Sequence, residues 1–459
     1  MPSGHYPPHL YTTGGALDSA DLQRELDHLR SHLKVNGVGK GKVLALVTDS
    51  SRLTALLFYA CSRLGVALFP LDPLMTKPRR LSLLRQAGAD FLIHQPDAFP
   101  SSGYPRILSL PGKSKASPAR EAEIALIIAT SGSSGSPKAV MLAPDALLAG
   151  ASAANAILGF SAGDCWLNCL PPFHIGGMAI HCRAALAGAA VVLHQGFDAG
   201  RLWHDLKLFP VTHLSLVPAM LSRLLDVADG PPPSWLRVVL IGGDALNEGL
   251  AACALAAGWP LWVSYGMSET AALVAASPAT RERLSPPLGL IGGIQCEVVD
   301  ESGQSTDGIG RIKLRGRSLM LGYANPLGMP GDGLDRNDWF LTSDLGQLDK
   351  QGLRVLGRAD GILVSGGEKI PPGVVEERLL DCPGIGAACV SGLTDTVWGQ
   401  RLCVYYEGPA TPEEVEAWCR EHIQGAMRPR LFRQVQRLPL LSNGKIDRQA
   451  IRQWAGDQG

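Results

Sequence analysis

A run of hydroxyl-bearing residues, glycines and a lysine is the part of this sequence most clearly suited to chemistry. Residues 130–138 read Thr-Ser-Gly-Ser-Ser-Gly-Ser-Pro-Lys, directly after the apolar run 124–129. The N–H and O–H groups of such a loop can surround phosphate oxygens, and the lysine supplies an opposite charge. A solvated Ser/Gly linker is the alternative, but linkers rarely follow a buried strand directly. The segment therefore predicts a phosphate-binding loop.

The spacing in this loop excludes a Walker P-loop. That motif needs Gly-Lys followed by Ser or Thr and then a helix. Here Lys138 follows Pro137, which would interrupt such a helix. We therefore expect a nucleotide's phosphates to bind here in a protein other than a Walker NTPase.

Six further segments combine glycine or aromatic residues with side chains that can donate protons or carry charge. They are Leu-Pro-Pro-Phe-His-Ile-Gly-Gly at 170–177, Ile-Gly-Gly-Asp-Ala at 241–245, Ser-Tyr-Gly-Met-Ser-Glu-Thr at 264–270, Trp-Phe-Leu-Thr-Ser-Asp at 339–344, Leu-Gly-Arg-Ala-Asp at 356–360 and Asn-Gly-Lys-Ile-Asp-Arg at 443–448. Each segment alone has an ordinary interpretation as a turn, a loop or a surface charge.

The elements that must position these segments alternate between strands and helices. Short apolar runs at 43–47, 66–69, 91–93, 190–193, 214–216 and 238–241 indicate buried parallel strands, and helical periodicity lies between several of them, for example at Leu22, Leu26, Leu29 and Leu33. This alternation predicts an α/β fold with two doubly wound sheets. From about 287 to 355 short strands interrupted by Gly and Asp predict a small β-barrel or sandwich.

Beyond Asp360 mixed strands and helices resume, with a helix expected at 412–422. We therefore expect a large N-terminal domain over 1–359 and a small, mobile α+β domain over 360–459. A chain of 459 residues is long enough for two or three folding units.

Composition narrows the class of partner. Lys plus Arg and Asp plus Glu number 42 each, so no basic surplus points to nucleic acid or to a membrane surface. The N-terminus lacks the features of a signal peptide, and apolar runs fall short of the ~20 residues that span a bilayer. We expect a cytoplasmic protein.

Ten cysteines lie singly along the chain, and Cys165 and Cys169 come nearest to forming a pair. We interpret the cysteines as reduced thiols, with a zinc site as the alternative.

Taken together and in this order, the motifs resemble those of the acyl-adenylate-forming superfamily, which includes acyl-CoA synthetases, peptide-synthetase adenylation domains and luciferases. The resemblance covers nearly the whole chain. It implies ATP, Mg²⁺ and CoA as cofactor, metal and co-substrate. It also implies a two-step reaction, in which a carboxylic acid becomes an acyl-adenylate and is then passed to a thiol.

By this resemblance, ATP contacts are carried over to individual residues. The phosphate loop comprises Thr130, Ser131, Gly132, Ser133, Ser134, Gly135 and Lys138, and Ser268 also touches phosphate. Gly243 and Asp244 pass alongside the adenine, and Tyr265, next to Gly266, stacks on it. Glu269 holds Mg²⁺, and Asp344 accepts the ribose hydroxyls, with Arg358 nearby.

Further roles follow from the resemblance for the acyl group and the thiol. His174 lies between the acyl pocket and the phosphates, with Gly177 beside it, and Lys445 is the catalytic lysine. Asp360 is the hinge of a rotation that removes Lys445 and brings in the thiol tunnel, which comprises Gly366, Gly367 and Glu368. Four positions depart from the usual pattern, namely Ala139, Pro144, Ser343 and Val374.

Within the superfamily, residues 191–198 and 211–218 most resemble the o-succinylbenzoate–CoA ligases of menaquinone biosynthesis. Arg183, nine positions after His174, stands where those ligases tend to carry a basic residue. A cation beside an acyl pocket is costly unless paired, which favours an aryl or dicarboxylic acid with a second carboxylate. The alternatives for Arg183 are extension to solvent or pairing with an internal acid.

Three alternatives stay open from sequence. The acyl group could go to an acyl carrier protein instead of CoA. The chain could be a non-catalytic nucleotide-binding relative, as the four departures would allow. The protein could also form a homodimer.

Overall fold

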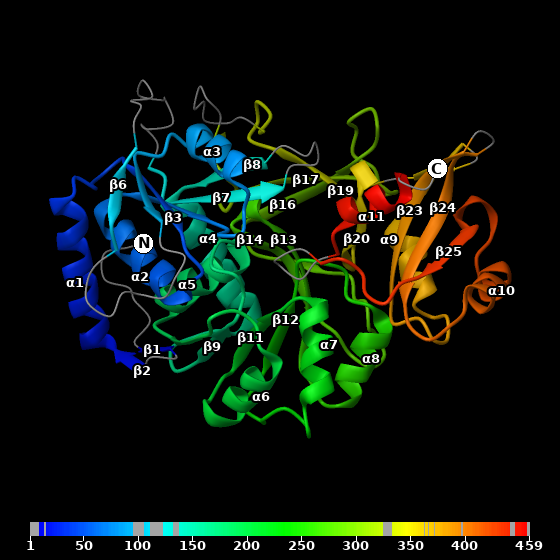
Figure 1. Ribbon diagram of the computed structural model, residues 1–459, viewed down its shortest axis with the longest axis horizontal. Helices are drawn as coiled ribbons and strands as arrows, with labels where there is room; N and C mark the ends of the chain where they lie inside the picture. Colours follow the sequence, from blue (N-terminus) through cyan, green and yellow to red (C-terminus); the bar gives the residue numbers. More distant parts are fainter. Residues whose placement is uncertain are drawn as a thin grey trace.

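The computed structural model describes residues 9–12, 15–94, 105–110, 123–131, 137–324, 333–361, 363–365, 367–370, 372–395, 398–440 and 446–456. Within these ranges the chain forms two large sheets, a smaller antiparallel sheet and a C-terminal α+β unit. Figure 1 shows the C-terminal elements gathered at one end of the long axis of the molecule. No helix in the described part of the chain is both long and apolar enough to cross a bilayer.

The first large sheet has seven strands. Their order is β18 (Gly322–Ala324), β8 (Pro137–Leu142), β7 (Leu126–Ser131), β4 (Ala67–Leu71), β3 (Val43–Val47), β5 (Phe91–His94) and β6 (Ile107–Ser109). The helices of this part are α1 (Ser19–Val35), α2 (Ser51–Leu64) and α3 (Lys77–Gln86). Strand β3 is buried along its whole length, as expected for a central parallel strand.

The second large sheet has nine strands. Their order is β15 (Gly289–Leu290), β14 (Ala272–Pro278), β13 (Leu261–Met267), β12 (Val238–Ile241), β11 (His213–Leu216), β9 (Cys165–Asn168), β10 (Ala190–Leu193), β1 (His9–Thr12) and β2 (Gly15–Asp18). Its helices are α4 (Pro144–Leu158), α5 (Ile175–Ala187), α6 (Ala199–Leu208), α7 (Pro218–Val227) and α8 (Glu248–Ala256).

Helix α5 lies in the apolar layer between the two large sheets. One continuous core contains residues of α1, α2, α4 and α5 together with one face of β9, represented by Trp166. Cys165 and Leu167, on the other face of β9, belong to a second core under α6, α7 and α8. Since alternate residues of a strand face opposite sides, β9 is buried on both faces. Polar side chains on α5 or β9 are therefore enclosed by the fold.

The remaining strands form two smaller sheets. An antiparallel sheet contains β16 (Ile294–Val299), β17 (Gly310–Gly316), β19 (Phe340–Asp349) and β20 (Gly352–Arg358). A short 3₁₀ turn, Ala359–Gly361, follows β20. The C-terminal sheet contains β22 (Glu368–Ile370), β21 (Leu363–Ser365), β24 (Gly399–Glu407), β23 (Ala387–Asp395) and β25 (Leu431–Gln434), with helices α9 (Pro372–Leu379), α10 (Pro412–His422) and α11 (Arg448–Gly456).

The expected α/β fold with two large sheets and a small C-terminal unit is confirmed. Strands at 43–47, 190–193 and 238–241 and the helix at 412–422 have the predicted bounds. The strand before the phosphate loop differs: β7 continues to Ser131 because Thr130 and Ser131 pair with Lys138 and Pro137 of β8. The loop therefore joins two antiparallel strands. The region expected to form a small barrel or sandwich is an antiparallel sheet of four strands.

Candidate active site

Three of the expected nucleotide-binding residues meet where β13, β19 and β20 come together. The Tyr265 hydroxyl donates a hydrogen bond of 2.7 Å to Asp344 Oδ2. Asp344 and Arg358 are paired across the β19–β20 ladder, and Arg358 Nη1 lies 4.0 Å from Asp344 Oδ1. Burial raises the pKa of Tyr265 above its ordinary value, and the charge of Asp344 raises it further, so the phenol stays a donor. The strands thus place a carboxylate, a guanidinium and an aromatic ring together.

A second group joins the end of the phosphate loop to Glu269. Strand β18 pairs with β8, which brings Tyr323 next to Lys138, whose Nζ lies 4.5 Å from the centre of the tyrosine ring. The Tyr323 hydroxyl donates a hydrogen bond of 2.8 Å to Glu269 Oε1. Tyr323 was not predicted from the sequence. The sequence around Tyr323 offers no signal beyond a tyrosine that follows Gly322. Its contacts with Lys138 and Glu269 become visible only when β18 pairs with β8.

Two glycines of the expected adenine site have conformational reasons to be glycine. Gly243 has φ +84°, a region that favours glycine. It is the second residue after β12. A Cβ on Gly266 would lie 1.7 Å from the Ala272 carbonyl oxygen of the adjacent strand β14. Gly266 therefore permits the bulge between β13 and β14 that turns the chain toward Ser268 and Glu269. Asp244 accepts a bond from the Ala245 N–H.

The phosphate loop is described only at its two ends. Thr130 and Lys138 are paired across β7 and β8. Gly132, Ser133, Ser134 and Gly135 lie outside the described residues, as do Gly366 and Lys445. The backbone of Ser131 ends β7, and that of Ser268 starts the 3₁₀ turn Ser268–Thr270 that carries Glu269.

The start of α5 is packed tightly against the loop that precedes it. His174 is the N-terminal cap residue of α5, and its N–H donates a 3.2 Å bond to the Pro171 carbonyl. A Cβ on Gly177 would lie 2.7 Å from the same oxygen. Gly177 therefore allows the close approach that fixes where His174 begins the helix.

Arg183 lies on α5 and is only 4 % exposed. Its guanidinium carbon stands 5.1 Å from the ring centre of Trp166 on β9, and the Trp166 Nε1–H donates to Ser215 Oγ at 3.1 Å. Burial lowers the pKa of Arg183 to about 10, which still leaves it charged at neutral pH. Among the described residues, none of the ion pairs includes Arg183. The alternative that Arg183 extends to solvent is therefore wrong, and an internal acid that pairs with it is not found in the described ranges.

The chain on either side of Lys445 is held by contacts within the C-terminal unit. Leu440 and Ile446 form a bridge, and the Asp447 N–H donates a 2.7 Å bond to the Pro439 carbonyl. Arg448 donates to Glu376 Oε1 and Oε2 at 2.7 and 2.5 Å. Burial alone would lower the pKa of Arg448, but Glu376 raises it, with a smaller contribution from Asp244 of the N-terminal part. The residues that flank Lys445 are thus fixed within the C-terminal unit, and Arg448 lies near enough to Asp244 of the expected adenine site to be affected by its charge.

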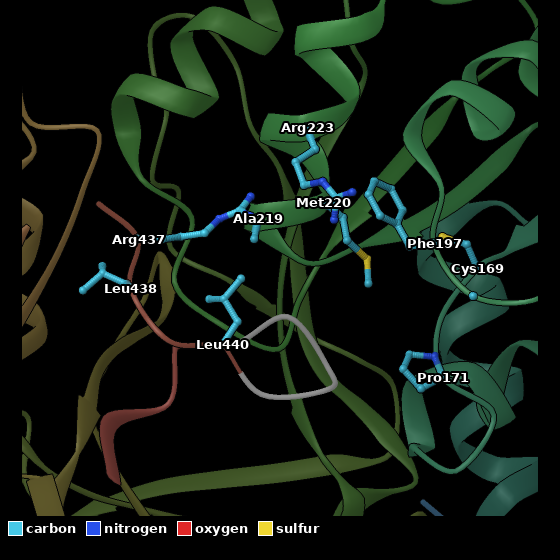
Figure 2. Close-up of a pocket in the computed structure, with 10 residues that line it drawn as sticks. Cys169, Pro171, Phe197, Ala219, Met220, Arg223, Arg437, Leu438 and Leu440 are labelled. Atoms are coloured by element: carbon cyan, nitrogen blue, oxygen red, sulfur yellow. The ribbon is translucent and has the colours of Figure 1, made fainter. Parts of the chain in front are cut away.

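A cavity of about 460 Å³ lies between this C-terminal segment and the ends of the central strands. Figure 2 shows Arg437 reaching from that segment toward Ala219 of α7, with Arg223 and Pro171 on the N-terminal side. Pro171 is three residues from His174, so the cavity opens beside the start of α5. The cavity lining, as far as the chain is described, does not include Gly367 or Glu368, which belong to the β21–β22 hairpin of the C-terminal sheet.

The potential metal ligands were compared across the part of the chain that the structure describes. Across the described ranges, no group of three or more His, Cys, Asp and Glu side chains could hold a metal ion. Burial raises the pKa of Cys165 and of Cys169 to about 12, which keeps both as thiols. One carboxylate such as Glu269 is nevertheless what Mg²⁺ uses when phosphate oxygens and water complete its ligands.

Chemically, the described residues supply a carboxylate with an aromatic neighbour at Asp344, and a lysine and a carboxylate linked through Tyr323. A buried cation lies deeper, on α5. By charge and hydrogen-bonding capacity, the outer groups suit a polyphosphate with a sugar and a flat base, and the inner cation suits an organic anion.

Comparison with known proteins agrees with this set of side chains. Residues 8–324 match the model of the AMP-binding enzyme family, and residues 374–445 match that of the AMP-binding enzyme C-terminal domain. The chain is 31% identical over 455 residues to 2-succinylbenzoate–CoA ligase of Bacillus subtilis strain 168, covering 94% of this chain and 92% of the relative.

Two solved structures allow the arrangement of the whole chain to be compared. The o-succinylbenzoate CoA synthetase of Bacillus subtilis in complex with the acyl-adenylate intermediate OSB-AMP has a TM-score of 0.84, at 26% identity, with 97% of this chain and 95% of that chain covered. A double mutant of the same enzyme bound with its product analogue OSB-NCoA has a TM-score of 0.69, at 27% identity and 97% and 96% coverage. The present arrangement is more similar to the acyl-adenylate complex.

Proposed function

Because the chain belongs to the AMP-binding enzyme family, we propose that it uses ATP to join o-succinylbenzoate to coenzyme A. Buried, positively charged Arg183 carries the substrate assignment. It lies nine residues after His174 on the same helix, and among the described residues it has no carboxylate partner. o-Succinylbenzoate has two carboxylates, so one can react while the other pairs with this guanidinium.

The first step replaces a poor leaving group with a good one. A carboxylate oxygen of the acid attacks the α-phosphorus of ATP, the bond from that phosphorus to the bridging oxygen breaks, and pyrophosphate leaves. Negative charge increases on the α-phosphate oxygens, so cations placed there lower the barrier. We assign this role to Lys445, and we assign the pyrophosphate end to Lys138 and the phosphate loop.

Other residues hold the nucleotide in line. Asp344 accepts the ribose hydroxyls, with Arg358 beside it, and the ring of Tyr265 packs against the adenine. Glu269 suits a Mg²⁺ ion, because Tyr323 donates to one of its oxygens and no described residue donates a hydrogen bond to the other. When bound, the ion would neutralise phosphate charge.

In the second step the thiol sulfur of coenzyme A attacks the acyl carbon, the carbon–oxygen bond to AMP breaks, and the thiol proton is released. We propose that the chain divides at Asp360 into a domain over 1–359 and a mobile domain over 360–459. Rotation of the second domain would withdraw Lys445 and bring Gly366, Gly367 and Glu368 toward the acyl group. The present arrangement, closer to the acyl-adenylate complex, supports its assignment to the first step.

Exchange of labelled pyrophosphate into ATP tests the proposal. We expect exchange with o-succinylbenzoate, and AMP release when coenzyme A is added. An Arg183→Leu variant should raise the KM for o-succinylbenzoate about 10- to 150-fold, because a charge-assisted hydrogen bond contributes roughly 1.5–3 kcal/mol. The KM for ATP should stay near the parent value.

The matched control for this variant is an acid that lacks the second carboxylate. With such an acid, parent and Arg183→Leu should differ little, since the lost interaction is absent from both. An equal effect of Arg183→Leu on both acids would contradict the substrate assignment. Thioester formation only with a phosphopantetheinylated carrier protein would contradict coenzyme A as acceptor.

A further inference from the structure

A series of buried polar side chains crosses the apolar layer between the two large sheets. Tyr59 of α2 places its Oη 2.9 Å from Nδ1 of His181 on α5. The Nε2 of His181 lies 3.4 Å from Nδ2 of Asn168, the last residue of β9. All three residues are at most 2 % exposed. Since buried polar groups are costly unless they are bonded, these contacts favour one relative placement of α2, α5 and β9.

Asn168 connects this series to the loop that leads to His174. Its Nδ2 donates a 3.0 Å bond to the Gly177 carbonyl in the first turn of α5. Its Oδ1 accepts a 3.2 Å bond from the Leu170 N–H. One side chain therefore ties the end of β9, the loop after it and the beginning of α5.

The directions of the bonds define the state of His181. The Asn168 amide nitrogen can only donate, so His181 Nε2 accepts, and Nδ1 carries the proton that is donated to the Tyr59 oxygen. This is the neutral imidazole, and burial lowers the pKa of His181 to about 4. Above that pH the contacts keep a single pattern.

The cation assigned to the acid substrate also lies on α5 and contacts the same face of β9. Arg183 lies two residues after His181, and Trp166 lies two residues before Asn168, on the same side of the strand. Trp166 stacks on Arg183, while Asn168 contacts His181. A shift of α5 along β9 would therefore move Arg183 and His174 together.

We propose that Tyr59, His181 and Asn168 are positioning residues that set α5 against β9 and so place His174 and Arg183 for the acid. This inference rests on the proposed function, in which these two residues face the substrate. It predicts that disturbing the series weakens use of the acid while ATP, held by other elements, binds as before.

Two substitutions at one position test this inference in the full-length protein. His181→Leu removes both bonds at similar volume, and should raise the KM for o-succinylbenzoate in pyrophosphate exchange about 10-fold or more, since misplacement by about 1 Å can cost 100-fold. His181→Gln should recover most of the parent value, because its amide can accept from Asn168 and donate to Tyr59. The KM for ATP should stay within about twofold in both.

A matched control lies on α2. Thr54→Val also removes a buried hydroxyl, but one that bonds to Ser50 O within the helix, so parent kinetics are expected. Equal acid KM for His181→Leu, Thr54→Val and parent, with each variant shown folded by near-ultraviolet circular dichroism, would overturn the inference. If His181→Leu does not fold, Tyr59→Phe decides: it should raise the acid KM, and an unchanged value overturns the inference. If the parent protein fails to exchange pyrophosphate with any carboxylic acid tested, the proposed function is instead refuted.

Discussion

Asp344 lies between a tyrosine hydroxyl and a guanidinium, and these contacts hold its carboxylate at the edge of the proposed nucleotide site. The backbone adds to this, because the Asp344 N–H donates a 3.0 Å bond to the buried Thr342 hydroxyl. A carboxylate fixed in this way can accept two adjacent hydroxyls without a further loss of side-chain entropy. Its contribution should therefore appear in ATP binding.

Replacing Asp344 with Ala should raise the KM for ATP about 10- to 100-fold, because hydrogen bonds to a charged group contribute roughly 1.5–3 kcal/mol. The KM for the acid should change little. Asp349→Asn, at the other end of β19, is the control, since its carboxylate only caps a turn at Gln351 and Gly352. Pyrophosphate exchange at varied ATP gives both constants. A larger effect on the acid than on ATP would contradict the role of Asp344.

Two buried histidines make stability depend on pH. Burial lowers the pKa of both His181 and His213 to about 4, whereas an unfolded chain titrates near 6.5. Between these values the unfolded state binds more protons, so stability falls as pH decreases from about 6.5 toward 4. Each residue contributes a slope of up to about 1.4 kcal/mol per pH unit.

Urea unfolding at several pH values measures this slope. The His181→Gln variant should lose stability less steeply than the parent between pH 6.5 and 4, because one titrating group is gone. Thr54→Val, which changes a buried residue of α2 without removing a titrating group, should retain the parent slope. Parallel curves for parent and His181→Gln would show that His181 does not remain neutral in the fold.

At the scale of elements, α5 combines an unusual number of constraints for one helix. Its first turn approaches the Pro171 carbonyl through Gly177, and it contacts β9 through polar as well as apolar residues. Gly176 is different, since a Cβ there would meet only the end of the Leu170 side chain, at 3.2 Å. Substitutions at these two neighbouring glycines can therefore distinguish the effect of close packing from that of helix propensity.

We expect Gly177→Ala to lower kcat/KM for the acid about 10- to 100-fold, because the added methyl group must push the Pro171 loop away from its place beside His174. Gly176→Ala should leave activity near the parent level. Both substitutions gain the same helix propensity, roughly 1 kcal/mol, so the comparison isolates the contact. Pyrophosphate exchange and thermal unfolding of both variants provide the measurement. Equal activities would contradict a role for this close approach.

Sequence patterns predicted the elements well where apolar periodicity was strong, as in β3 and α10, because burial alone defines such segments. They could not place Tyr323 beside Lys138 and Glu269, since that contact needs β18 to pair with a strand far away in the sequence. His181 and Asn168 were missed for a related reason. A polar residue within an apolar run shows its partner only when the two layers are packed.

For the whole molecule, the anchoring of the C-terminal segment is the central physical feature. Glu376 is nearly buried and accepts from Arg448 and from the Val390 N–H. Removing either charge would leave the other uncompensated, which is strongly unfavourable. This ion pair joins α9 to α11 within the C-terminal unit, so it would move with that unit in the rotation proposed above.

The division of labour between the two arrangements gives the last prediction. Lys445→Ala should lower acyl-adenylate formation about 100-fold or more, because a cation at the α-phosphate is lost from the transition state. Thioester formation from supplied o-succinylbenzoyl-adenylate and coenzyme A should stay within severalfold of the parent, since the proposed rotation withdraws this lysine before the second step. Arg437→Ala, in the same segment but at the cavity, is the comparison for general disturbance of the segment. Pyrophosphate exchange follows the first half-reaction, and the thioester absorbance follows the second. Equal loss of both half-reactions in Lys445→Ala would mean that one arrangement of the chain performs both steps.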